Sequence, residues 1–160
     1  MILVRRAVFD TSTLVSAALR PSSIPERALL LTLEHATVCV CDFALDELGS
    51  VPGRDKFDRY LTRSARQEFV SLLRRNALSI QLRQNDIDTV EPSCRDRRDN
   101  LFLALAEAAA ADVIVGSDED LLVHHSWRGI PIVSLFQSRN EPEGLVRGGQ
   151  RGRLLLGMIS

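Results

Sequence analysis

The chain has 160 residues, of which 45% are hydrophobic and 26% charged, and this length and composition suit one globular domain with its own core. Its 20 basic and 21 acidic side chains give a formal net charge of -1, which gives no global argument for a polyanionic partner. Its apolar runs are shorter than the roughly 20 residues of a membrane helix, and the order of charges at the start is unlike a secretory signal. We therefore expect a soluble, cytoplasmic protein.

Local features stand out within this neutral total. Residues 54–75 carry seven basic side chains against three acidic ones, which is the local excess that contact with a nucleic acid would need. The three cysteines, Cys39, Cys41 and Cys94, lack the paired spacing of a zinc ribbon or a redox motif. We therefore expect free thiols, with Cys39 and Cys41 on one face of a strand.

Strand-like and helix-like hydrophobic periods alternate along the chain. The expected strands are 4–9, 37–41, 78–82, 112–116 and 130–134. The expected helices are 13–19, 25–33, 43–50, 64–76, 100–111 and 119–125, with a polar connection at 83–98. This alternation predicts an α/β fold, a three-layer α/β/α sandwich around a central, mostly parallel sheet. We expect the domain to span residues 1–138 and residues 139–160 to form a Gly- and Arg-rich C-terminal extension that ends as an edge strand or a partner contact.

Acidic residues stand where two of the strands are expected to end. Asp10 follows the first strand, and Asp118 and Asp120 follow the strand at 112–116. Ligands of open α/β sheets bind outside the carboxyl ends of the strands, so these carboxylates are expected to meet in one crevice. Each acid is also a good N-cap or first-turn residue for the following helix, and capping alone is a sufficient explanation for any single one.

Glu47 is harder to explain as a surface residue. It lies one helical turn from Phe43 and Ala44 and is therefore expected on the apolar face of its helix. An inward-facing carboxylate is costly unless it is paired or binds a cation. The partner is either a metal ion or an arginine such as Arg5 or Arg6.

Asp99 precedes the helix at 100–111, as an N-cap would. Three arginines surround it: Arg95, Arg97 and Arg98. They are either solvated loop charges or groups that hold phosphates beside the acids.

Several ionised acids in one crevice would repel one another unless a cation lay between them. Oxygen ligands without a Cys or His set favour Mg²⁺ or Mn²⁺. Such an ion lowers the pKa of bound water and stabilises the charge that develops on a phosphodiester during in-line attack. Acids, a metal and nearby arginines together indicate nuclease chemistry.

Four stretches in this order, "VFDTSTLVSA", "LDELGSV", "RRDNLFLALAEAAAADVIVGSDEDLL" and "GIPIVS", resemble the PIN-domain family over residues 4–138. The chain looks most like the bacterial group of toxin components of toxin-antitoxin pairs. The resemblance implies a metal-dependent endoribonuclease, a homodimer, and inhibition by a small antitoxin protein. The acidic pocket it implies is formed by Asp10, Glu47, Asp99 and Asp118.

Within that pocket the resemblance implies Asp10, Asp99 and Asp118 as metal ligands, with Asp120 as a further acid beside them. Glu47 would bind the metal or orient the attacking water. The family's usual Asn two residues after the first Asp is Ser12 here, a shorter group that still hydrogen-bonds to a carboxylate or to substrate.

Two other functions compete with this interpretation. Phosphatases of the haloacid-dehalogenase type also place an Asp after the first strand, but the second Asp of their motif is Ser12 here. A PIN-like module that binds RNA or protein without cleavage would keep the fold, although retention of all four acids argues against it. The adjacent His124 and His125 point about 100° apart on a helix and are interpreted as surface residues rather than metal ligands.

Overall fold

The computed structural model describes residues 3–50 and 61–135, and within them five strands form one parallel sheet. The strand order is β3-β2-β1-β4-β5, and every neighbouring pair is parallel. The strands are β1 Arg6–Phe9, β2 Thr37–Val40, β3 Leu78–Ser79, β4 Val113–Val115 and β5 Ile132–Val133. Because β1 lies in the middle, its carboxyl end, where Asp10 follows, opens at the centre of the sheet edge.

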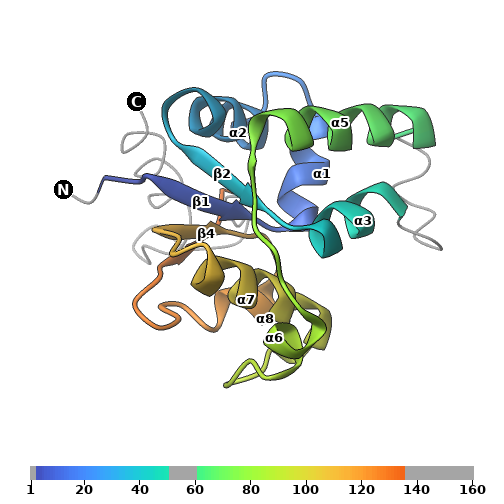
Figure 1. Ribbon diagram of the computed structural model, residues 1–160. Helices are drawn as coiled ribbons and strands as arrows, with labels where there is room; N and C mark the ends of the chain where they lie inside the picture. Colours follow the sequence, from blue (N-terminus) through green and yellow to red (C-terminus); the bar gives the residue numbers. More distant parts are fainter. Residues whose placement is uncertain (1–2, 51–60, 136–160) are drawn as a thin grey trace.

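Helices cover both faces of this sheet (Figure 1). They are α1 Thr11–Leu19, α2 Ile24–His35, α3 Asp42–Ser50, α5 Arg63–Asn76, α6 Gln84–Asp88, α7 Asn100–Ala108 and α8 Glu119–Leu122, with a 3₁₀ turn, η1, at Arg97–Asp99. In Figure 1, α1, α2 and α5 lie above the sheet, and α6, α7 and α8 lie below it. The expected three-layer α/β/α architecture is therefore confirmed.

Alternating side chains of the strands divide the core into two layers. Ala7 and Phe9 pack with Leu29 and Leu73 on the face covered by α1, α2 and α5. Val8 packs on the opposite face, against α7. The three cysteines are buried free thiols in this second layer, and Cys39 and Cys41 share the same face of the sheet, as expected.

The largest error in the expected elements is the polar stretch 83–98, which contains α6 and η1 rather than a plain connection. Its helix has a single buried anchor, Ile87, and its start is fixed because the Arg83 N–H donates to Asp86 Oδ2 at 2.8 Å. One apolar residue gives no hydrophobic period, so the pattern could not reveal this helix. The expected strand 78–82 is shorter than predicted and covers only Leu78–Ser79.

Two expectations concern residues outside the described ranges. The C-terminal extension 139–160 and the domain boundary at 138 lie wholly there, as do the basic residues Arg54, Lys56 and Arg59. Of the basic residues that are described, Arg74 bonds to Asp42 with an N–O distance of 2.9 Å.

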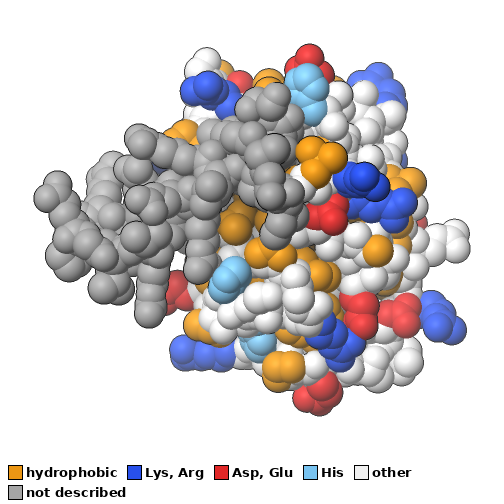
Figure 2. Space-filling view, turned by 90° about the vertical axis from the view of Figure 1, so that its left-hand side faces the viewer, with side chains coloured by type: hydrophobic (Ala, Val, Ile, Leu, Met, Phe, Trp, Pro, Cys, Tyr) orange, Lys and Arg blue, Asp and Glu red, His pale blue; other side chains and the backbone are white. Residues whose placement is uncertain are grey.

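No helix within 3–50 or 61–135 is both long and apolar enough to cross a bilayer. Basic and acidic side chains are interspersed on the side of the molecule where β1 begins (Figure 2).

Candidate functional site

Asp10 links the ends of two neighbouring strands. Its Oδ1 accepts a hydrogen bond from the Thr13 N–H at 2.8 Å and so caps α1. Its Oδ2 accepts one from the Ser117 N–H, just beyond β4, at 3.0 Å. The residue is only 3% exposed, and this burial raises the pKa of its carboxyl group although the hydrogen bonds of Thr13 and Ser117 oppose the shift.

The approach to Asp10 is close at Gly116. A Cβ at this glycine would lie 3.1 Å from Asp10 Oδ2 and 2.8 Å from Leu121 Cδ2. Leu121 is fully buried, so it has little room to withdraw. Only a residue without a side chain therefore fits between β4 and the Asp10 carboxylate.

Asp118 begins α8 as its N-cap, and its Oδ1 accepts a hydrogen bond from the Asp120 N–H at 2.9 Å. The sequence-based alternative of capping is thus realised for Asp10 and for Asp118. Capping uses one oxygen of each carboxylate in this way, and it is compatible with a second role for the group.

Asp99 differs from these two acids because its side chain makes no capping hydrogen bond, although it stands at the N-cap position of α7. Among the described residues no donor reaches its buried Oδ2 atom. Burial, followed by the negative charges of Asp118, Asp96, Asp10 and Glu47, raises the pKa of the Asp99 carboxyl to about 7. A buried oxygen without a protein donor keeps its lone pairs available to a ligand such as a cation.

Three carboxylates converge at this point. One oxygen atom from each of Asp99, Asp118 and Asp120 lies within 4.8 Å of the other two. The negative charges of Asp10 and Glu47 also act on this cluster, since both contribute to the raised pKa of the Asp99 carboxyl. We call Asp99, Asp118 and Asp120 the acidic cluster, and Asp10 and Glu47 its neighbours.

The chemistry of these donors fits a hard divalent cation. All are carboxylate oxygens, the ligand type of Mg²⁺ and Mn²⁺. The Cys94 thiol, on which the charges of the cluster act, has its pKa raised to about 12 by burial and by the charges of Asp99 and Asp120, so it stays protonated and is a poor ligand. His125 Nδ1 accepts a hydrogen bond from the Ile132 N–H at 2.9 Å, which ties that ring to β5.

Glu47 lies at the edge of the buried face of α3 and is half-buried. That face is formed by Ala44, Leu45 and Leu48, whereas Phe43 is 37% exposed. Ala44 therefore faces the core as expected and Glu47 lies beside it, whereas Phe43 does not, because the apolar face is centred about one residue further on.

Arg5 and Arg6, the sequence-based candidates to pair with Glu47, lie where β1 begins, at the opposite end of the sheet from Asp10. The backbone N–H groups of Arg5 and Arg6 both donate to Asp112 Oδ2 at 2.8 Å. The Arg6 side chain donates through Nη1 to the Ala109 carbonyl. The charge of Glu47 instead acts on Arg98 and Asp99.

The residues expected to contact substrate differ in exposure and pairing. Ser12 is half-buried in the first turn of α1, and Arg95 and Arg97 are exposed. Arg98 Nη2 contacts Asp96 Oδ2 at 2.8 Å, and its Nε also donates to that carboxylate. Sequence reasoning missed this pairing, although the spacing of two residues in "DRR" brings the two side chains to one turn.

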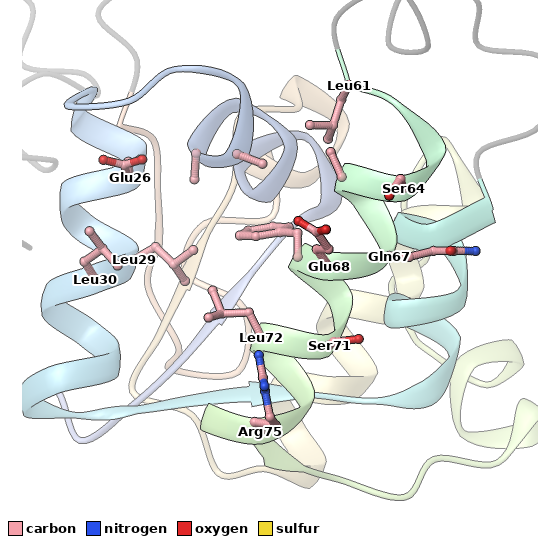
Figure 3. Close-up of a pocket in the computed structure, with 14 residues that line it drawn as sticks. Glu26, Leu29, Leu30, Leu61, Ser64, Gln67, Glu68, Ser71, Leu72 and Arg75 are labelled. Carbon is pink, nitrogen blue, oxygen red and sulfur yellow. The ribbon is translucent and has the colours of Figure 1, made fainter.

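A groove of about 730 Å³ lies between α1, α2 and α5 (Figure 3). Leu29 of α2 and Leu72 of α5 point into the space between the two helices, and Glu26, Glu68 and Arg75 supply its charged groups. None of the lining residues belongs to the acidic cluster or its neighbours. The groove is therefore a separate feature of the surface.

Comparison with known proteins agrees with this architecture. The family model for the PIN domain matches residues 6–120, while no curated protein matches the sequence. The fold is similar to the crystal structure of VapBC2 from Rickettsia felis bound to a DNA fragment from their promoter, with a TM-score of 0.54 and 12% identity over 81% of this chain and 98% of that chain. An identity this low supports the fold alone, but the family match spans more than half of the chain. The chain therefore belongs to the PIN-domain family.

Proposed function

We propose that this protein is a metal-dependent endoribonuclease that hydrolyses RNA phosphodiester bonds at the acidic cluster, and that it acts as the toxin of a toxin-antitoxin pair. Membership of the PIN-domain family, whose members are generally nucleases, supports the reaction type. The observation that carries the proposal is Asp99, whose buried Oδ2 has no donor among the described residues and lies beside two further carboxylates.

The residues divide by role. Asp10, Asp99 and Asp118 hold Mg²⁺ or Mn²⁺, with Asp120 beside them, and Glu47 binds the metal or orients the attacking water. The ion supplies positive charge for the scissile phosphate and lowers the pKa of water. Arg95, Arg97 and Arg98 hold phosphates of the RNA, and Ser12 hydrogen-bonds to a carboxylate or to the substrate. The Arg98 side chain is 67% exposed although it pairs with Asp96, so its guanidinium remains accessible to a phosphate.

The test is cleavage of a mixed-sequence single-stranded RNA by the purified protein, with Mn²⁺, with Mg²⁺ and with excess chelator. We expect cleavage that requires one of the ions and stops in chelator. If RNA is bound but never cut, while Mn²⁺ leaves the melting temperature unchanged, the chain is a binding module and the nuclease proposal is wrong.

Glu47→Gln separates a role in cleavage from a role in stability. Glutamine keeps the shape of the side chain but removes its charge, so we expect cleavage to fall by about 100-fold or more, with little change in melting temperature. The measurement is the single-turnover rate beside a thermal melt. A large loss of stability with unchanged activity per folded molecule would show that Glu47 serves only as a structural ion-pair partner.

We also propose a small antitoxin protein as partner, a homodimer as the assembled form, and the cytoplasm as the location. The resemblance to toxin components supports the first two. Three buried thiols that remain unpaired support a reducing compartment. Co-expression with the product of a neighbouring short reading frame, followed by a pull-down and the RNA assay, tests for the inhibitor.

A further inference from the structure

Asn100 is a buried polar residue whose side chain closes the loop that carries Asp99. It is the first residue of α7 and is 3% exposed. Its Oδ1 accepts a hydrogen bond from the Cys94 N–H at 2.7 Å, and its Nδ2 donates to Ser93 Oγ at 2.9 Å. The side chain thus spans from the start of α7 back to residues 93–94.

The loop between these two anchor points, residues 95–99, contains Asp99 of the acidic cluster. It also contains Asp96, whose charge contributes to the raised pKa of Asp99. Cys94 is itself buried in the core layer beside α7, so the bond from its N–H joins the buried start of the loop to the first residue of α7.

Asp99 depends on this closure because its own side chain contributes nothing to holding it. The carboxylate makes no capping bond to α7, and Oδ2 has no donor among the described residues. The Asp99 N–H donates to the Asp96 carbonyl at 3.0 Å, a contact inside the loop that moves with it. The position of the carboxylate is therefore set by the backbone on either side, which Asn100 clamps.

We propose that Asn100 is a positioning residue for the metal centre: it closes the loop 93–100 and thereby holds the Asp99 carboxylate against Asp118 and Asp120. This role rests on the proposed function, since it presumes that the acidic cluster binds a divalent ion. Groups that orient metal ligands without touching the metal typically contribute tenfold to 100-fold in affinity.

The experiment is titration of the metal-free full-length protein with Mn²⁺ by calorimetry, for the wild type, Asn100→Ala, Ser93→Ala and Thr32→Ala. Thr32 is a matched control, because it is also fully buried and hydrogen-bonded, to the Ala28 carbonyl at 2.7 Å, but lies on α2 on the opposite face of the sheet. We expect Asn100→Ala to raise the Kd for Mn²⁺ by about tenfold or more. Ser93→Ala, which leaves the bond to Cys94, is expected to raise it by about threefold. Thr32→Ala should lower the melting temperature without changing the Kd.

An unchanged Kd in Asn100→Ala would overturn the proposal, and Ser93→Ala provides the same test if Asn100→Ala does not fold. Amide hydrogen exchange of Cys94 supplies a readout without metal, since loss of its acceptor should speed exchange there and not in α2. A wild-type protein that binds no Mn²⁺ is a different result, because it contradicts the metal site itself rather than the role of Asn100.

Discussion

Asp99→Asn should weaken Mn²⁺ binding by about 100-fold or more. In the metal-free protein the same change should raise the melting temperature at pH values above 7. Both effects come from the same carboxylate. It supplies a charged oxygen to the metal, and without metal its charge is buried beside those of Asp118, Asp96, Asp10 and Glu47. Asparagine keeps the shape and removes the charge.

The pH dependence follows from the direction of the pKa shift. The Asp99 carboxyl titrates near its ordinary value of 3.8 in the unfolded chain and at about 7 in the folded one. Ionisation therefore stabilises the unfolded chain first, so folding loses free energy as the pH rises from about 4 to about 7 and keeps the full loss above that. Because the group is partly exposed, we expect Asp99→Asn to recover on the order of 1–2 kcal/mol at pH 8 and almost nothing at pH 4.

Thermal melts across this pH range, with and without Mn²⁺, test the prediction. Asp88→Asn is the matched control, since Asp88 is an exposed acid on α6 whose Oδ1 accepts a hydrogen bond from Gln84 Nε2. It should leave both the Mn²⁺ affinity and the pH dependence unchanged. Equal behaviour of the two variants would mean that Asp99 is an ordinary surface carboxylate.

Gly116→Ala should lower both the stability and the activity of the protein. The added Cβ would meet Asp10 Oδ2 at 3.1 Å and Leu121 Cδ2 at 2.8 Å, so one or both must move. Overpacking of this kind typically costs about 1–3 kcal/mol. Displacement of Asp10 also strains its bonds to the Thr13 and Ser117 amides, so we expect cleavage to fall by about tenfold or more.

Gly49→Ala is the internal comparison for this change. A Cβ at Gly49 would meet Val70 Cγ2 at 3.6 Å, an ordinary contact, and the residue lies within α3. Alanine favours a helix over glycine, so this variant should be stabilised by about 0.5–1 kcal/mol and remain active. The melting temperatures of the two variants should therefore shift in opposite directions, and only Gly116→Ala should cleave more slowly. A stable, fully active Gly116→Ala would contradict this expectation.

The sequence predicted the fold well where hydrophobic periods are long. β1, α1, α2 and α7 lie close to their expected ranges, since each presents several apolar residues to the core. The sequence also predicted correctly that Asp10 and Asp118 follow the carboxyl ends of two strands, which are β1 and β4 in the structure. The hydrophobic pattern did not predict α6 because the only buried residue of this helix is Ile87. Such a short helix is stabilised by tertiary packing rather than by its own sequence pattern.

The sequence singled out the acidic residues of the candidate site, but it did not show which of them also cap helices through their side chains. The sequence offered capping as an alternative explanation for Asp10, Asp99 and Asp118, and the structure separates them: Asp10 and Asp118 cap helices through their side chains, whereas Asp99 does not. Spacing could not reveal this, because it depends on the α-helical backbone of Asp99 at the start of α7. Asp10 supports two elements through hydrogen bonds, so substitutions there mix folding with activity, and Asp99 is the sharper probe.

The pairing of Asp96 with Arg98 and the closure by Asn100 also lay beyond the sequence. Both depend on how the loop 93–100 folds back on itself, and loops carry no hydrophobic period. The sequence left Arg98 as a solvated loop charge or a phosphate-binding group and did not reveal its ion pair with Asp96.

The most direct test of the acidic cluster as a nuclease centre is the rate of Mn²⁺-dependent cleavage of one single-stranded RNA by the wild type, Asp99→Asn and Asp88→Asn, prepared identically. We expect the wild type and Asp88→Asn to cleave at equal rates, and Asp99→Asn to be slower by about 1,000-fold or more. Identical preparation makes a contaminating ribonuclease visible as activity common to all three. Cleavage by Asp99→Asn at the wild-type rate, or cleavage that persists in chelator, would contradict the proposed metal centre.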